Sequence, residues 1–113
     1  MIEVYGIKNC DSVKKALSFF KKHEIDFILH DFKTSPVGCN EVEKWLQKVD
    51  IATLFNARST TYRNLKLKEK NLNNDEKKEW LCKENLLIKR PVVIFNDEII
   101  VGFKEEIYQR KFL

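Results

Sequence analysis

The sequence has no apolar run that approaches the ~20 residues of a membrane-spanning helix, and its amino terminus lacks the basic and apolar segments of a signal peptide. Its three cysteines are an odd number, and their wide spacing predicts no disulfide framework. We therefore expect no membrane partner and a cytoplasmic location, where a cysteine is either catalytic or inert.

Linkers, repeats and low-complexity segments are also absent from the sequence. His23 and His30 are isolated, so no ligand set of the zinc type is expected. The net charge of +4 comes from lysine and glutamate mixed along the chain, which is typical of solvated helix faces. We therefore expect no bound metal and no direct contact with nucleic acid.

Apolar periodicity predicts the order β-α-β, then several helices, then β-β-α. Predicted strands cover residues 2–5, 26–32, 90–95 and 99–101; predicted helices cover 11–22, 73–84 and 104–109; short helices or loops cover 51–70; and a hairpin turn covers 96–98. A further helix is expected to open at Asn40, where Glu43 has the spacing of a capping box. Asn73 and Glu76 have the same spacing.

These elements constrain the architecture. The first two strands flank one helix, which indicates a right-handed parallel βαβ unit, and the last two form an antiparallel hairpin followed by a helix. Together they predict an α/β fold of the thioredoxin-like type with a four-stranded mixed sheet. We expect one domain over residues 1–113, in which 1–35 and 87–113 are the thioredoxin-like halves and 36–86 are a helical insertion.

Cys10 lies between the first predicted strand and the first predicted helix. A sulfur in the first turn of a helix lies beside unpaired backbone N–H groups and the positive end of the dipole, which favour the thiolate. Lys8 and Lys14 add positive charge nearby. Cys10 is therefore a candidate nucleophile, and an inert packing residue is the alternative. Because Val13 stands where a C-x-x-C motif has its second cysteine, a single-thiol mechanism is expected, with an external thiol such as glutathione or a distant cysteine.

Two arginines are candidates for binding an anion. Arg90 precedes Pro91 at the start of the third predicted strand, where thioredoxin-like folds have a cis-proline close to the active cysteine. Arg58 lies in a polar stretch, and its planar guanidinium can hold a carboxylate or an oxyanion through two hydrogen bonds. A solvated surface position is the alternative for each.

Four motifs together resemble the ArsC/Spx family, and most closely its YffB-like branch. They are NCDSVKKA at residues 9–16, ARSTTYR at 57–63, IKRPV at 88–92 and VGF at 101–103. The resemblance covers nearly the whole chain in the family's order and implies a thioredoxin-like fold with a helical insertion. It also implies that Cys10 matches the nucleophilic cysteine, and that Arg58 and Arg90 match two arginines that bind the oxyanion in the arsenate reductases.

The resemblance further implies the chemistry. In the arsenate reductases the cysteine attacks arsenate, glutathione joins the adduct, and glutaredoxin regenerates the enzyme; YffB-like proteins are regarded as glutathione-dependent thiol reductases. We therefore expect an oxidoreductase without a tightly bound cofactor, with glutathione as co-substrate and glutaredoxin as a partner. Around the nucleophile, the residues expected to contact the substrate or glutathione are Lys8, Asn9, Asp11, Ser12 and Pro91.

Two positions depart from the arsenate reductases. Gly6 stands where those enzymes have a histidine four residues before the cysteine, and Lys104 stands near their third arginine. An ammonium group cannot reproduce the two-pronged contact of a guanidinium, so both departures argue against efficient arsenate reduction.

The other two cysteines, Cys39 and Cys82, are weaker candidates for a chemical role than Cys10. Some family members resolve the adduct with an internal cysteine from the later helix, which makes Cys82 a candidate resolving thiol; a helical packing thiol is the alternative. Cys39 shows no partner in the sequence and is interpreted as incidental.

A regulator is the alternative to an enzyme. Spx-like members of the family bind the C-terminal domain of the RNA polymerase α-subunit. Spx senses oxidation through C-x-x-C, which Val13 removes here, so this alternative is a binding module that does not respond to oxidation.

Overall fold

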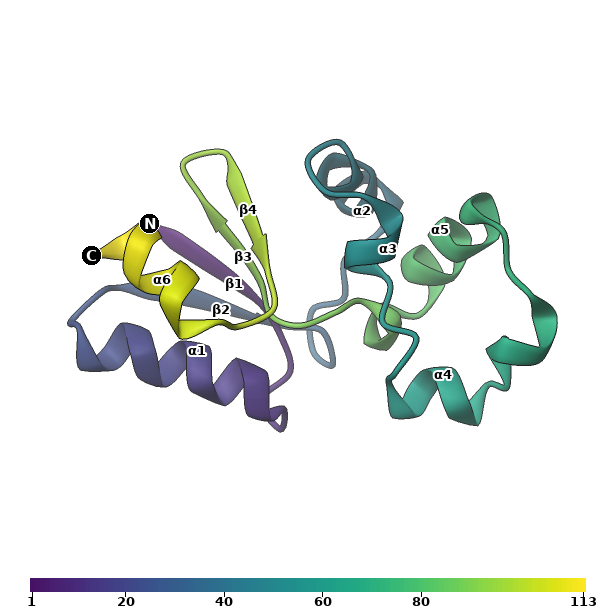
Figure 1. Ribbon diagram of the computed structural model, residues 1–113, viewed down its shortest axis with the longest axis horizontal. Coiled ribbons are helices and arrows are strands. Elements are labelled where there is room, and N and C mark those ends of the chain that lie inside the picture. Colours follow the sequence, from purple (N-terminus) through teal and green to yellow (C-terminus); the bar gives the residue numbers. More distant parts are fainter. The chain divides into compact units, whose positions relative to one another are not determined.

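The computed structural model describes residues 1–113 and divides into two compact units. Unit 1 consists of Met1–Thr34 and Arg90–Leu113, and unit 2 of Ser35–Lys89 (Figure 1). The assignment of both units to one thioredoxin-like domain stays a prediction. None of the helices combines the length and the apolar composition needed to cross a membrane.

Unit 1 contains the four-stranded mixed sheet, which confirms the predicted fold class. Its strands are β1 (Ile2–Gly6), β2 (Phe27–Asp31), β3 (Val92–Phe95) and β4 (Glu98–Val101), arranged in the order β2-β1-β3-β4 (Figure 1). β1 runs parallel to β2 and antiparallel to β3, and β3 runs antiparallel to β4. The central position of β1 places the end of this strand, and the loop to Cys10, between β2 and β3.

Two helices share one apolar core with the sheet. They are α1 (Asp11–Lys22) and α6 (Glu105–Phe112), and the core cluster consists of Ile2, Val4, Ala16, Phe19, Phe20, Val93 and Tyr108. Val13, Ala16, Phe19 and Phe20 form the buried face of α1. The ring of Phe19 packs edge-on against Tyr108, with the centroids 5.6 Å apart.

The β3–β4 hairpin and the turn after it complete unit 1. Asn96 and Asp97 both adopt positive φ, 48° and 63°, as two-residue hairpin turns of type I′ require. Gly102 follows β4 at φ 86°, and its carbonyl accepts a hydrogen bond of 2.9 Å from the buried hydroxyl of Tyr108. This bond ties α6 to the turn that leads into it.

Unit 2 is built from short helices. They are α2 (Cys39–Leu46), α3 (Ile51–Leu54), α4 (Thr60–Asn64), η1 (Leu67–Lys70), α5 (Asn74–Lys83) and η2 (Asn85–Leu87). The capping box predicted at Asn73 and Glu76 is confirmed, since each side chain accepts from the backbone N–H of the other residue. The capping box predicted at Asn40 is wrong, because α2 begins one residue earlier with Gly38 as its N-cap and has no side-chain cap.

A disulfide bond between Cys39 and Cys82 also contradicts the sequence-based interpretation, in which neither cysteine had a disulfide partner. The bond joins the first residue of α2 to the last turn of α5, with the two Cα atoms 4.8 Å apart. The buried Asn85 reinforces the same junction: its amide nitrogen donates to the carbonyls of Val37 and Leu81, and its oxygen accepts from the Val37 N–H at 2.7 Å. The packing of α2 against α5 brings these two cysteines together, although they are 43 residues apart in the sequence.

Candidate functional site

Cys10 is the N-cap residue of α1 and the free cysteine of the chain. Its backbone is extended, with φ −144° and ψ 124°, and its carbonyl accepts the first helical hydrogen bond from the Lys14 N–H at 2.9 Å. No side chain caps this helix, so the N–H groups of the first turn have no side-chain oxygen as acceptor. The half-buried thiol of Cys10 therefore stands at the capping position, where those N–H groups and the helix dipole favour a negative charge.

Gly6, at the end of β1, lies directly against Val13. A β-carbon built on Gly6 would be 2.7 Å from Cγ2 of Val13, and Val13 is completely buried. No residue with a side chain fits at position 6 unless Val13 moves. Val13, which stands where a C-x-x-C motif has its second cysteine, therefore also occupies the space that a side chain at position 6 would need.

Arg90 and Pro91 lie at the same end of the sheet as the loop to Cys10. The Arg90–Pro91 peptide bond is cis, as predicted for a thioredoxin-like fold. The antiparallel register pairs Tyr5 with Val92, the first residue of β3, so Arg90 and Pro91, which precede β3, reach the end of β1. The Cβ atom of Arg90 lies 3.8 Å from the β-carbon position of Gly6, four residues before Cys10. Unit 1 thus brings Cys10 and Arg90 to one end of its sheet.

Arg58 belongs to unit 2, where hydrogen bonds fix its backbone. Its N–H donates to Oδ1 of Asn56 at 3.0 Å, and its carbonyl accepts from Nη1 of Arg63 at 3.0 Å. The next residue, Ser59, is buried and caps α4 by accepting from the Tyr62 N–H. The side chain of Arg58 is exposed, so it presents its guanidinium from a fixed turn.

The remaining predicted contact residues differ in exposure. Lys8, Asn9 and Asp11 are exposed, Ser12 is half-buried and Pro91 is buried, with its carbonyl accepting from the Gly102 N–H. Their roles toward a substrate stay predictions, as do those of Arg58 and Arg90. Cys82, the candidate resolving thiol, is bonded to Cys39 in this structure and must first be reduced before it can act as a nucleophile.

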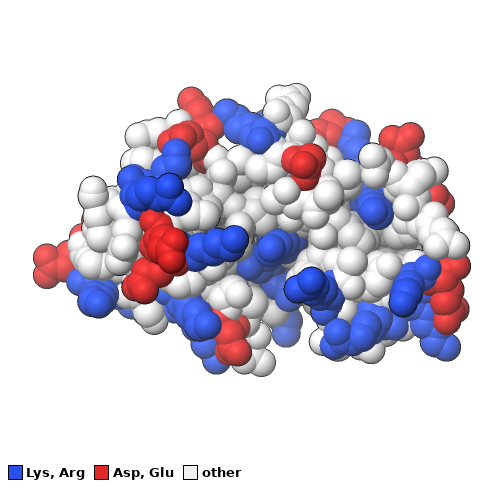
Figure 2. All heavy atoms as spheres, viewed as in Figure 1, with Lys and Arg blue, Asp and Glu red and all other residues white.

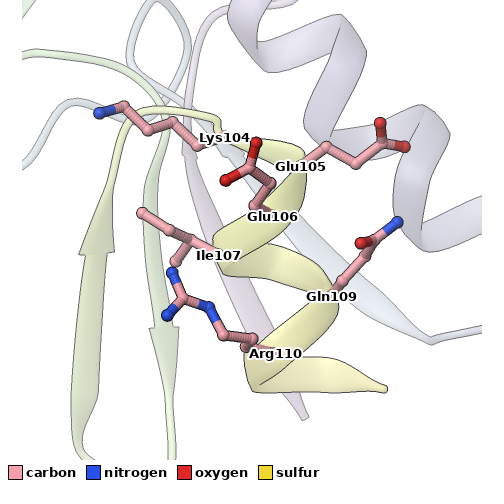
Figure 3. Close-up of a pocket in the computed structure, with 6 residues that line it drawn as sticks. All are labelled: Lys104, Glu105, Glu106, Ile107, Gln109 and Arg110. Atoms are coloured by element: carbon pink, nitrogen blue, oxygen red, sulfur yellow. The ribbon is translucent and has the colours of Figure 1, made fainter.

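Lys104 is exposed at the N-cap of α6 and lines a hollow of about 500 Å³ on that helix. Figure 3 shows its side chain extending away from Glu105 and Gln109, which lie on the other side of the helix. Glu105 and Glu106 line the same hollow, so two carboxylates reduce the attraction of Lys104 for an anion. This environment differs from the purely basic one expected of a third oxyanion-binding group.

The chain matches the model of a known protein family and is similar in sequence to several proteins. Residues 5–111 match the model described as the ArsC family. The chain is 40% identical over 113 residues to a protein of Haemophilus influenzae whose function is uncharacterised, covering 99% of both chains. It is 26% identical to the global transcriptional regulator Spx 1 of Lactococcus lactis, covering 94% of this chain and 84% of the regulator.

Two solved structures share the fold along the chain. A protein named YffB superposes with a TM-score of 0.91 at 28% identity, covering 100% of both chains. An arsenate reductase (ArsC) related protein from Brucella melitensis superposes with a TM-score of 0.77 at 32% identity, covering 98% of this chain and 93% of that one. The fold of unit 1 around Cys10 is therefore one that arsenate reductase-like proteins share.

Proposed function

The chain belongs to the ArsC family, and we propose that it is a thiol reductase that uses Cys10 as its single nucleophile and glutathione as its co-substrate. The observation that carries this proposal is the position of a free cysteine at the uncapped start of α1. The thiolate is the reactive form of cysteine, and the first-turn N–H groups of α1 are donors that an anion at this position can bind. We propose a cytoplasmic location, where reduced glutathione is abundant and where the Cys39–Cys82 bond is open to reduction.

The reaction begins when the Cys10 thiolate attacks the glutathione sulfur of a disulfide between the substrate and glutathione. The substrate–glutathione S–S bond breaks, a Cys10–glutathione disulfide forms, and the substrate thiolate leaves and takes a proton from solvent. The thiolate of a second glutathione, or of a glutaredoxin, then attacks the same glutathione sulfur; it releases glutathione disulfide, or a glutaredoxin–glutathione disulfide, and returns Cys10 to the thiolate. Arg90 supplies a positive charge at this end of the sheet, and Arg58 is proposed to bind a carboxylate of glutathione.

Two features of unit 1 make arsenate a poor substrate in this proposal. Val13 leaves no space for a side chain at position 6, and Lys104 shares its surroundings with Glu105 and Glu106. A weaker set of positive groups stabilises the charge of a bound oxyanion less well in the transition state.

Intact-mass measurement after incubation with oxidised glutathione tests the proposal. We expect one glutathionyl group on the wild-type chain, located on Cys10, and none on Cys10→Ser. Adding glutaredoxin and reduced glutathione should remove the group, and arsenate should not be required. A wild-type chain that gains no glutathione on Cys10, or a Cys10→Ser variant that retains full reductase activity, contradicts the proposal.

The similarity to Spx 1 supports a second candidate function, a module that binds the C-terminal domain of the RNA polymerase α-subunit. Because Val13 removes the C-x-x-C motif, this binding would not respond to oxidation at Cys10. A pull-down with the purified α-subunit domain distinguishes the two functions. Stable stoichiometric binding that survives Cys10→Ser favours the regulator, and its absence favours the enzyme.

A further inference from the structure

Unit 2 contains a hollow of about 580 Å³ on its surface, and Arg58, proposed above to bind a carboxylate of glutathione, is one of the residues that line it. We name it the Tyr62 pocket; the charged and aromatic residues that line it are Arg58, Tyr62, Arg63, Lys66, Lys68 and Glu69. Its volume lies in the range of about 300–1,000 Å³ that is usual for small-molecule sites, far more than one oxyanion needs. In Figure 2 basic side chains gather over the part of the molecule where Figure 1 places α4.

The charges around the Tyr62 pocket are strongly unequal. Two guanidinium groups and two ammonium groups line it, against the single carboxylate of Glu69. The hollow on α6 in Figure 3 is balanced by comparison, since its lining includes two basic residues, Lys104 and Arg110, and two acidic ones, Glu105 and Glu106. The Tyr62 pocket therefore attracts a ligand that carries more than one negative charge. Its single carboxylate, Glu69, can bind one positive group of the same ligand.

The backbone holds these charges in place. Leu67 is completely buried and anchors the start of η1, so Lys66 and Lys68 on either side of it are directed to the surface. Lys66 adopts the left-handed conformation, with φ 54° and ψ 39°, which is unfavourable for a residue with a side chain and is typical of positions where the fold imposes a turn. Nη2 of Arg63 donates to Oγ1 of Thr60 at 3.3 Å, in addition to its Nη1 bond to the Arg58 carbonyl.

Tyr62 provides the apolar part of the pocket. Its half-buried ring packs edge-on against the buried Phe55, with the centroids 5.8 Å apart. A ring fixed in this way offers a flat surface for the aliphatic portion of a ligand, while the surrounding cations bind its charged ends.

We propose that the Tyr62 pocket binds a peptide-sized molecule with two carboxylates and one ammonium group, the class to which glutathione belongs. The basic groups bind the two carboxylates, Arg58 by a two-pronged contact, and Glu69 binds the ammonium group. The inference deepens the proposed function, on which it rests for the identity of the ligand. It adds Tyr62, Lys66, Lys68 and Glu69 to the residues that determine specificity.

S-methylglutathione is the probe that tests binding separately from chemistry, because its blocked sulfur cannot form a disulfide with Cys10. Titration of the full chain, followed by NMR, should shift the amide signals of residues 57–69. Lys66→Gln and Lys68→Gln should each weaken binding roughly two- to fivefold, the effect of one exposed ion pair. Lys70→Gln is the matched control in the same helix: Nζ of Lys70 lies 5.7 Å from the centroid of the Trp80 ring, outside the pocket, and this variant should bind like the wild type.

Glu69→Gln should change the binding of two ligands in opposite directions. It should weaken binding of S-methylglutathione, which has an ammonium group, and strengthen binding of glutarate, which has two carboxylates and no ammonium group. Absence of any shift in residues 57–69, equal effects of Lys68→Gln and Lys70→Gln, or equal responses of the two ligands to Glu69→Gln overturns the assignment of the pocket.

The mass measurement with oxidised glutathione and the NMR titration with S-methylglutathione together separate this inference from the proposed function. If Cys10 accepts glutathione from its oxidised form while S-methylglutathione leaves residues 57–69 unchanged, the pocket assignment is wrong and the thiol reductase stands. If S-methylglutathione binds as described while Cys10 remains unmodified, the pocket stands and the reductase is wrong.

Discussion

The two units of this chain maintain their structures by different means. Unit 1 has a sheet whose register aligns distant residues, and aromatic rings of α1 and α6 fill its core. Unit 2 has short helices, none longer than the ten residues of α5, and it contains the disulfide and the buried Asn85. Short helices bury little apolar surface individually, so specific side-chain bonds contribute more to their arrangement.

The difference matters for function. The sheet fixes the backbone that leads to Cys10, and close packing, as between Gly6 and Val13, determines the surroundings of that backbone. In unit 2 the polar bonds of Asn56, Ser59 and Arg63 fix the turn of Arg58. Substitutions that remove a bond should therefore act mainly on unit 2, and substitutions that add volume should act mainly on unit 1.

The largest expected effect is the loss of the disulfide. Replacing Cys39 and Cys82 by serine should lower the stability of unit 2 by roughly 2–4 kcal/mol, because the bond closes a loop across 43 residues of separation. Hydrogen exchange should then become faster in α2 and α5 and remain unchanged in β1 and β3. Cys10→Ser serves as the control, since Cys10 is free. Equal acceleration in the sheet would show that the units do not differ in this way.

A methyl group added at Gly6 should have the next largest effect. Gly6→Ala places a carbon 2.7 Å from Val13 and should destabilise unit 1 by about 1–3 kcal/mol, the usual range for overpacking. Gly38→Ala is the matched control in unit 2: nothing lies within 4 Å of its β-carbon position, and only the change of N-cap residue remains, below about 1 kcal/mol.

Denaturant midpoints measure both glycine variants. Combining Gly6→Ala with Val13→Ala should reverse the clash, so the effects of the two substitutions should be less than additive. Additive effects, or equal costs at Gly6 and Gly38, would contradict the close packing of Val13 against the end of β1.

The smallest effect on stability is expected from the loss of a buried hydrogen bond in unit 1. Tyr108→Phe removes the hydrogen bond to the Gly102 carbonyl and should cost about 1 kcal/mol near neutral pH. Burial raises the pKa of Tyr108 far above its usual value. The unfolded chain therefore loses this phenolic proton first, at a pH of about 10, and the stability that Tyr108 contributes declines above that pH.

Unfolding free energies of the wild type and Tyr108→Phe, measured near pH 8 and again near pH 11, test this sign. The advantage of the wild type should shrink at the higher pH, while changes from lysine titration are common to both proteins. An advantage that stays constant or grows would show that the folded state does not hold Tyr108 in its protonated form.

Features that depend on neighbouring residues were predictable from the sequence. The β-α-β and β-β-α order follows from apolar periodicity, and the capping box at Asn73 follows from two residues three positions apart. The place of Cys10 at the start of a helix has the same local origin. The N-cap of α2 is Gly38 and not the predicted Asn40. Both residue types are common at N-caps, so the local sequence does not distinguish between the two positions.

The tertiary structure decided the contacts that no local sequence pattern encodes. The Cys39–Cys82 bond depends on α2 and α5 packing together, and the contact of Gly6 with Val13 depends on how α1 folds back onto β1. The Tyr62 pocket includes Lys66, whose left-handed backbone conformation no local pattern indicates for a lysine. The sequence alone thus determined that the Cys10 thiol lies at the start of α1, because the apolar pattern of that helix is local. The surroundings of that thiol and the disulfide required the fold, because packing is decided by the whole chain.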